Sequence, residues 1–168
     1  LQDKGFLLEL SSELKKRDVR KPIYLKISPD MNEFLIKEIS EIVGDSTFAG
    51  IIATNTSHIP KLGDGGISGR LIKEKSRETR NQVLSILDES SEKDVIGVGG
   101  VDSIEDIWDF WYHGGKYMQV YTSFIYHGPK LFTSYASRFE MLMSYFGVSS
   151  VEELINVAQS EKIKLPGV

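Results

Sequence analysis

One stretch decides the fold: Val95-Ile96-Gly97-Val98-Gly99-Gly100-Val101-Asp102-Ser103. Its first four residues form a short apolar run that is typical of a buried β-strand. The next two glycines favour a tight turn, and Ser103 followed three residues later by Asp106 is a helix-start signal. The predicted helix extends to Tyr112. The stretch is therefore one β/α unit, made of a strand, a glycine turn and a helix.

The same unit recurs on both sides of this stretch. The predicted strands are residues 23–27, 48–53, 95–98 and 117–121, and the predicted helices are residues 4–17, 31–43, 73–87, 103–112, 129–146 and 151–158. Apolar strands that alternate with helices predict an α/β fold with a parallel sheet. Two architectures fit, an open doubly wound sheet and part of a (β/α)8 barrel. A complete barrel takes about 250 residues, so four units in 168 residues would be half of one.

The composition excludes several classes of protein. The chain has 20 Lys and Arg against 24 Asp and Glu, a net charge of −4, whereas nucleic-acid-binding proteins usually carry a basic stripe; we expect no nucleic-acid partner. The absence of cysteine excludes disulfides, thiolate metal sites and a cysteine nucleophile. The three histidines lack metal-ligand spacing, so no metal site is expected. The longest apolar run, residues 48–53, is far shorter than the about 20 residues of a membrane-spanning helix.

The beginning of the chain shows neither an initiator Met nor a basic leader. We therefore expect the chain to start partway through a longer product.

Polar side chains gather where the predicted strands end, which is where parallel α/β folds build their sites. Lys26 lies between apolar neighbours in its strand, so it faces the opposite side of the sheet from them. A buried lysine there would need an anion or a carbonyl, although a snorkelling or salt-bridged lysine is an equally good interpretation. Thr54, Asn55 and Thr56 follow the second strand and could bind a polar ring by its edges, but a plain polar turn has the same composition.

Glycine-rich segments follow the second and third strands. Gly65-Gly66-Ile67-Ser68-Gly69-Arg70 holds more glycine than a plain turn requires, and glycine permits close approach of a ligand to the backbone. The Gly99-Gly100 turn, followed by a helix N-terminus, is suited to holding phosphate. Tyr121 and Thr122 follow the fourth strand and would face the same phosphate. In barrels the phosphate site frequently lies after strands 7 and 8, which favours the second half of a barrel.

Five motifs stand in a distinctive order: Leu25-Lys26-Ile27-Ser28-Pro29-Asp30, Ala53-Thr54-Asn55-Thr56, Gly65-Gly66-Ile67-Ser68-Gly69-Arg70, Ile96-Gly97-Val98-Gly99-Gly100, and Gln119-Val120-Tyr121-Thr122-Ser123 continuing to Tyr126-His127-Gly128-Pro129. In this order and spacing they resemble the C-terminal half of a class 2, quinone-dependent dihydroorotate dehydrogenase. The likeness covers residues 21–159. It departs from the family pattern at Leu71, where a proline is usual, and in residues 57–64, where the loop is shorter than in several relatives.

The resemblance implies a role for each matched residue. Lys26 would lie at the pyrimidine edge of the cofactor FMN and stabilise the anionic reduced flavin, while Asn55 and Thr56 would hydrogen-bond the orotate ring. The remaining FMN contacts that the resemblance implies are Thr54, Gly69, Gly99, Gly100, Tyr121 and Thr122.

The resemblance also implies the wider enzyme. Its reaction is the oxidation of dihydroorotate to orotate in pyrimidine biosynthesis, with a quinone as the final electron acceptor. The catalytic base, a serine, is expected upstream of Leu1, so this chain contributes no catalytic residue of its own. The missing N-terminal half of the barrel and the membrane-contacting part are likewise expected outside this chain, at the periphery of a bacterial or mitochondrial inner membrane.

Within residues 1–168 we expect a single domain: a preceding helix over 1–20, strands 5 to 8 of the barrel with their site loops over 21–128, and C-terminal helices over 129–168. Three alternatives stay open from the residues alone: an FMN barrel acting on another pyrimidine, a phosphate-binding barrel without flavin, and a non-catalytic half-barrel that serves only in assembly.

Overall fold

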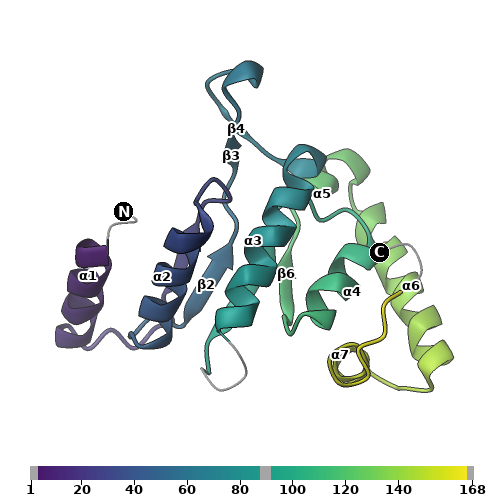
Figure 1. Cartoon of the computed structure of the whole chain (residues 1–168). Helices are drawn as coiled ribbons and strands as arrows, with labels where there is room; N and C mark the ends of the chain where they lie inside the picture. Colours follow the sequence, from purple (N-terminus) through teal and green to yellow (C-terminus); the bar gives the residue numbers. More distant parts are fainter. Residues whose placement is uncertain (1–3, 88–91, 166–168) are drawn as a thin grey trace.

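Parallel strands in simple chain order form the centre of the computed structural model, which describes residues 4–87 and 92–165 (Figure 1). The sheet has the order β1 (Tyr24–Ile27), β2 (Gly50–Ala53), β5 (Asp94–Val98) and β6 (Tyr117–Gln119), and each neighbouring pair is parallel. A doubly wound sheet reverses its strand order at a switch point, and this sheet does not. The order is that of consecutive barrel strands, so the partial barrel is confirmed over the open sheet.

Helices connect the strands in the way that the sequence predicts. They are α1 (Lys4–Lys16), α2 (Glu33–Gly44), α3 (Lys73–Ile86), α4 (Ile104–Tyr112), α5 (Thr122–His127), α6 (Lys130–Phe146) and α7 (Val151–Ser160). The predicted start of α4 is confirmed, because the Ser103 side chain accepts from the Asp106 amide and the Asp106 side chain accepts from the Ser103 amide. This reciprocal capping satisfies amides that a helix start otherwise leaves unpaired. The predicted domain boundaries extend over residues 1–3 and 166–168, which lie outside the described residues.

The two faces of the sheet differ in burial, because successive side chains along a strand point to opposite faces. Ile27, Ile51 and Val95 are buried against the helices. Lys26, at the opposite parity, is exposed, and Ile52 is half-buried. A one-sided helical cover is what half of a barrel presents, because the other face is the barrel interior.

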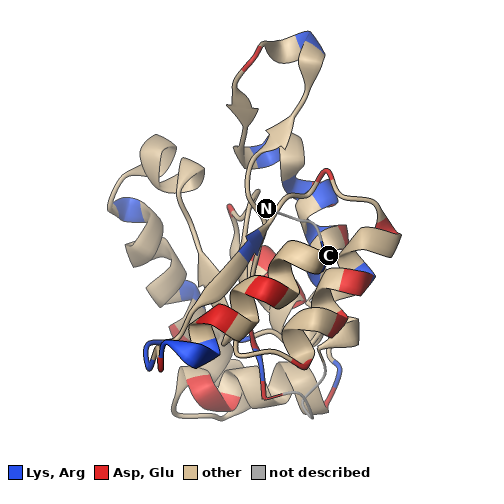
Figure 2. Cartoon of the chain, turned by 90° about the vertical axis from the view of Figure 1, so that its left-hand side faces the viewer, with Lys and Arg blue, Asp and Glu red and all other residues tan. Residues whose placement is uncertain are grey.

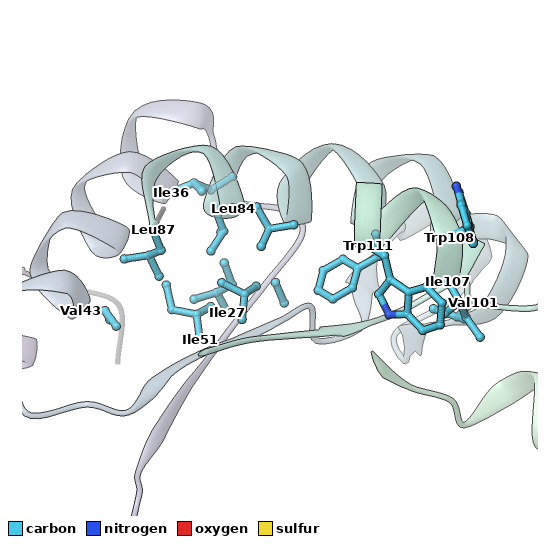
Figure 3. Packing of buried hydrophobic residues seen from close by; sticks show 14 of the residues in the cluster. Ile27, Ile36, Val43, Ile51, Leu84, Leu87, Val101, Ile107, Trp108 and Trp111 are labelled. Carbon is cyan, nitrogen blue, oxygen red and sulfur yellow. The ribbon is translucent and has the colours of Figure 1, made fainter. Parts of the chain in front are cut away.

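The core lies between the strands and the helices (Figure 3). Ile27 and Ile51 lie across from Leu84 and Leu87 in the same cluster.

A second part of the core joins α4 to α6. Trp108 stacks on Phe146 with 5.4 Å between ring centroids, and Trp111 stacks on Phe139 at 5.3 Å. These contacts give both tryptophans a packing role. They fix the C-terminal helices to the β/α units.

Two small elements were not predicted. Residues 57–67 form an antiparallel hairpin of β3 (Ser57–His58) and β4 (Gly66–Ile67), which projects beyond the carboxyl ends of the strands in Figure 1 and stands clear of the helices in Figure 2. The short helix α5 occupies the segment that leads to Gly128. Both are too short for periodicity to reveal.

Candidate functional site

A cavity of about 210 Å³ lies at the carboxyl ends of the strands. Its walls include all nine residues for which the sequence predicts a cofactor or substrate contact: Lys26, Thr54, Asn55, Thr56, Gly69, Gly99, Gly100, Tyr121 and Thr122. These residues come from four parts of the chain: β1 itself, the connection from β2 to α3, the turn after β5 and the residues after β6. Parallel strands bring them to one edge of the sheet, since all four strands end there.

Lys26 brings a positive charge to this cavity. It lies on the helix-free face of β1, opposite in parity to the buried Ile27. Within residues 4–87 and 92–165, no carboxylate lies within ion-pair distance of its amine. The salt-bridged interpretation that the sequence leaves open is therefore not met among these residues, and the ammonium group is available to a ligand.

The three polar residues after β2 are held in different ways. Thr54 is almost fully buried, its hydroxyl lies 2.9 Å from the Ser76 hydroxyl of α3, and its amide donates to the Val98 carbonyl at 2.8 Å. Asn55 is exposed, and its side-chain oxygen accepts from the Thr56 amide at 2.9 Å. The Asn55 amide group thus has its two N–H donors left for a ligand, whereas the Thr54 hydroxyl mainly joins the strand end to α3.

The Gly99-Gly100 turn contributes a backbone donor. Among the described residues, no carbonyl or side chain accepts a hydrogen bond from the Gly100 amide, whereas the Gly99 amide faces β6, where Val98 pairs with Gln119. Gly100 has φ +71, and a Cβ there would lie 2.3 Å from the Lys73 Cα. Glycine is therefore required by the packing of this turn against α3 as well as by its conformation.

The N-terminus of α4, which follows the Gly99-Gly100 turn, is capped by a side chain of the helix itself. The Asp106 carboxylate accepts from the Asp102 and Ser103 amides, both at 3.1 Å. These two amides are therefore not available to a phosphate. The donors that the sequence predicts for a phosphate belong to the turn itself.

A network of charges surrounds that capped helix start. Lys73 lies 2.8 Å from Asp106 and 3.1 Å from Asp102, and Arg70 also pairs with Asp102. Burial by itself raises the pKa of Asp102, but hydrogen bonds from Arg70 and Lys73 outweigh it and hold that pKa below its ordinary value. The ion pairs of Asp102 and Asp106 with Lys73 tie α4 to the start of α3.

Asp30 anchors the hairpin to the end of β1. It accepts from the Ser57 hydroxyl at 2.5 Å and from the His58 amide at 2.6 Å, and it pairs with Lys75. Burial raises the pKa of Asp30, but these donors outweigh burial and lower it to about 2. Because Ser57 directly follows Thr56, this contact also fixes the segment that reaches the cavity.

Sequence reasoning missed several residues of the cavity wall, among them Ser68 and Gln119. The Ser68 hydroxyl accepts from Thr122 at 2.9 Å, which joins the segment before α3 to α5. Gln119 pairs in register with Val98, so strand alternation would have placed it on the helix-free face.

A larger cavity, of about 510 Å³, lies at the amino ends of the strands beside Asp94 and Tyr117. Sites of parallel α/β folds lie at the opposite end. Asp94 also already accepts from the Tyr24 hydroxyl at 2.7 Å, a contact that raises the pKa of Tyr24. We therefore take the smaller cavity as the candidate site.

Comparison with known proteins agrees with this geometry. The family model described as dihydroorotate dehydrogenase matches residues 1–143. The chain belongs to this family. A dihydroorotate dehydrogenase (quinone) from Christiangramia forsetii is 39% identical over 145 residues, covering 78% of this chain and 41% of the relative. One from Nitratiruptor sp. is 36% identical over 162 residues, covering 94% of this chain and 45% of the relative.

A solved structure has the same fold. The crystal structure of DHODH from Eimeria tenella in complex with ferulenol superposes with a TM-score of 0.72 at 24% identity, covering 88% of this chain and 46% of that one. The chain thus spans about half the length of the dihydroorotate dehydrogenases that it matches. Membership in a flavin-dependent family favours a flavin site over the phosphate-binding barrel without flavin.

Two further searches of the described residues gave negative results. No helix within 4–87 and 92–165 is both long and apolar enough to cross a membrane. No group of three or more potential metal ligands was found in the same part of the chain.

Proposed function

We propose that this chain forms the C-terminal half of a quinone-dependent dihydroorotate dehydrogenase that uses FMN to oxidise dihydroorotate to orotate. The observation that carries the proposal is the convergence of nine residues, from four segments of the chain, on one cavity. It is rare for one cavity to be lined by coincidence with a free lysine, an available amide side chain and an unpaired backbone amide.

The cavity suits FMN by its chemistry and by its size. The unpaired Gly100 amide suits a phosphate, and the free Lys26 ammonium suits the electron-rich edge of a flavin ring. Ligand pockets usually measure about 300–1,000 Å³, so a cavity of about 210 Å³ would enclose only part of a nucleotide. A partial enclosure is what one half of a barrel would give.

Each residue then has a separable task. FMN, when bound, would accept a hydride from dihydroorotate. Lys26 would hold the cofactor ring by charge, and the Gly99-Gly100 turn with Tyr121 and Thr122 would hold its phosphate end. Asn55 would present its amide N–H groups to the carbonyl and carboxylate oxygens of the pyrimidine. Thr56 would add a hydroxyl beside it.

The rest of the enzyme would supply what this chain lacks in the proposal. The relatives are about twice as long as the matched part, and their additional length is where we place the serine base and the first half of the barrel. The quinone site and the contact with the membrane periphery also belong to that part. The exposed edges of β1 and β6 would pair with its strands, since unpaired strand edges favour aggregation.

The test is a visible absorption spectrum of the natural protein, expressed from its intact gene. We expect a flavin spectrum that dihydroorotate bleaches without oxygen and that a quinone restores. A spectrum indifferent to dihydroorotate would support an FMN enzyme acting on another pyrimidine, and absence of flavin would refute the proposal.

A matched pair of variants tests the site. Asn55→Ala should raise the dihydroorotate concentration needed for half-maximal bleaching by about tenfold, since one polar contact to substrate is lost. Asn156→Ala makes the same change at an exposed position of α7, away from the cavity, and should leave that concentration unchanged.

A further inference from the structure

Arg80 of α3 is a buried cation that the proposed chemistry does not use. Its side chain is only 2% exposed. It packs over Gly97 on the helix-facing side of β5, where a Cβ on the glycine would lie 3.0 Å from the Arg80 Cδ. Burial of a charge is costly unless the charge is compensated, so a buried arginine at this place needs an explanation.

The Arg80 guanidinium donates to the turn that carries the free Gly100 amide. One of its nitrogens, Nη1, lies 2.7 Å from the Gly99 carbonyl oxygen and 3.3 Å from the Val98 carbonyl oxygen. In a trans peptide the N–H points opposite to the C=O. The Gly100 amide shares its peptide with the Gly99 carbonyl, so it points away from Arg80, toward the cavity that the turn lines. The Gly99 amide faces the neighbouring strand β6 instead.

The charge of Arg80 is not cancelled by a direct partner. Within residues 4–87 and 92–165, no carboxylate lies within ion-pair distance of its guanidinium. Asp106 and Asp109 act on it only from farther away, and the neighbouring cation Arg77 opposes them. Burial lowers the pKa of Arg80 to about 10, so the side chain still carries its charge at neutral pH. A whole positive charge thus lies behind the Gly100 amide.

We propose that Arg80 is the positioning residue of an anion site for the FMN phosphate, which it builds from behind by orienting the Gly100 amide and adding its buried charge. It does not touch the phosphate. The inference rests on the proposed function, since it assumes that a phosphorylated flavin binds in this cavity. It goes beyond that function by assigning the phosphate preference to a side chain outside the cavity wall.

The experiment compares FMN with riboflavin, which lacks the phosphate. Dissociation constants for both are measured by flavin fluorescence on the natural protein stripped of cofactor, for the unaltered protein and for Arg80→Met. Arg80→Met removes the guanidinium and keeps an apolar stem. We expect FMN affinity to fall about tenfold to a hundredfold, the loss typical of one charged hydrogen-bonding group, while riboflavin affinity stays within about twofold.

The matched control is Arg77→Met. Arg77 lies on the same helix but pairs with Asp106 and Asp109 rather than with the turn carbonyls. It should lower stability without changing the ratio of the two affinities. An equal loss of FMN and riboflavin binding in Arg80→Met, or the same change of ratio in Arg77→Met, overturns the inference and shows a merely structural role.

Two further outcomes are also decisive. If Arg80→Met does not fold, Arg80→Lys replaces it. This variant keeps the charge but lacks the planar set of N–H donors of the guanidinium. An unchanged ratio of FMN to riboflavin affinity in Arg80→Lys would overturn the positioning role. If the unaltered protein binds FMN no better than riboflavin, the phosphate site itself is wrong. The proposed function then fails first, and the inference about Arg80 fails with it.

Discussion

Replacing Gly100 with alanine should damage the turn more than the backbone conformation alone explains. Gly100 has φ +71, and an alanine in that region is strained by about 1 kcal/mol. Its Cβ would also lie 2.3 Å from the Cα and 2.7 Å from the Cβ of Lys73. Because the first of these atoms is backbone, α3 or the turn must shift, and overpacking of this kind costs about 1–3 kcal/mol. We therefore expect a total loss of about 2–4 kcal/mol.

The chain offers a control for the conformational part. Gly147, at the end of α6, has φ +67, and a Cβ there would meet nothing within 4 Å. Gly147→Ala should therefore cost only about 1 kcal/mol. Urea unfolding of both variants in the natural protein gives the difference, which isolates the steric contribution. FMN affinity should fall in Gly100→Ala alone. Equal stability losses, or unchanged FMN affinity in Gly100→Ala, would refute the reasoning.

Three more predictions concern the hydrogen bonds of Asp30, the charge of Lys26 and the stacking of Trp108. The pKa of Asp30 is lowered to about 2, so its carboxylate stabilises the folded state above about pH 4 and that contribution is lost as the pH falls toward 2. Asp30→Asn should cost about 1 kcal/mol at pH 7, after allowance for solvent screening, and urea unfolding should show the difference from the unaltered protein vanishing in acid. Lys26→Gln should weaken FMN binding about tenfold by fluorescence titration; unchanged binding would place the flavin elsewhere. Trp108→Phe removes a 2.7 Å hydrogen bond to the Ile163 carbonyl and part of the stack on Phe146, so unfolding should require about 1–2 kcal/mol less; a smaller loss would show that the indole N–H is solvated in the folded protein.

The sequence was sufficient to predict the β/α order because each strand and long helix carries its own periodicity. It also predicted that the candidate residues gather at one edge of the sheet, since the carboxyl ends of parallel strands meet there whatever the helices do. It missed the 57–67 hairpin and α5, which are too short to show a period. It did not predict that the Asp106 carboxylate also accepts from the Asp102 amide, a contact that only the fold reveals.

Arg80 shows a different limit of sequence reasoning. It precedes Val83, Leu84 and Leu87 by three, four and seven residues, so it lies on the apolar face of α3. The spacing could have flagged a charged residue among core positions. It could not have shown that the Val98 and Gly99 carbonyls accept hydrogen bonds from the Arg80 guanidinium. These residues lie 18 and 19 positions after Arg80, and only the packing of α3 on β5 brings them together.

The order of the strands also limits which ligands can reach both ends of the candidate site. Lys26 belongs to β1, whereas Tyr121 and Thr122 follow β6, three strand spacings away. At about 4.8 Å per spacing, the free cation and the far end of the phosphate cradle stand about 14 Å apart across the sheet. A small phosphorylated sugar cannot engage both ends at once. A nucleotide-like ligand, with a polar ring at one end and a phosphate at the other, can do so, and its ring end then lies beside Asn55 and Thr56, the residues that follow β2. Under the proposed function, the sheet itself would thus orient FMN and place the pyrimidine against the flavin ring rather than against the phosphate.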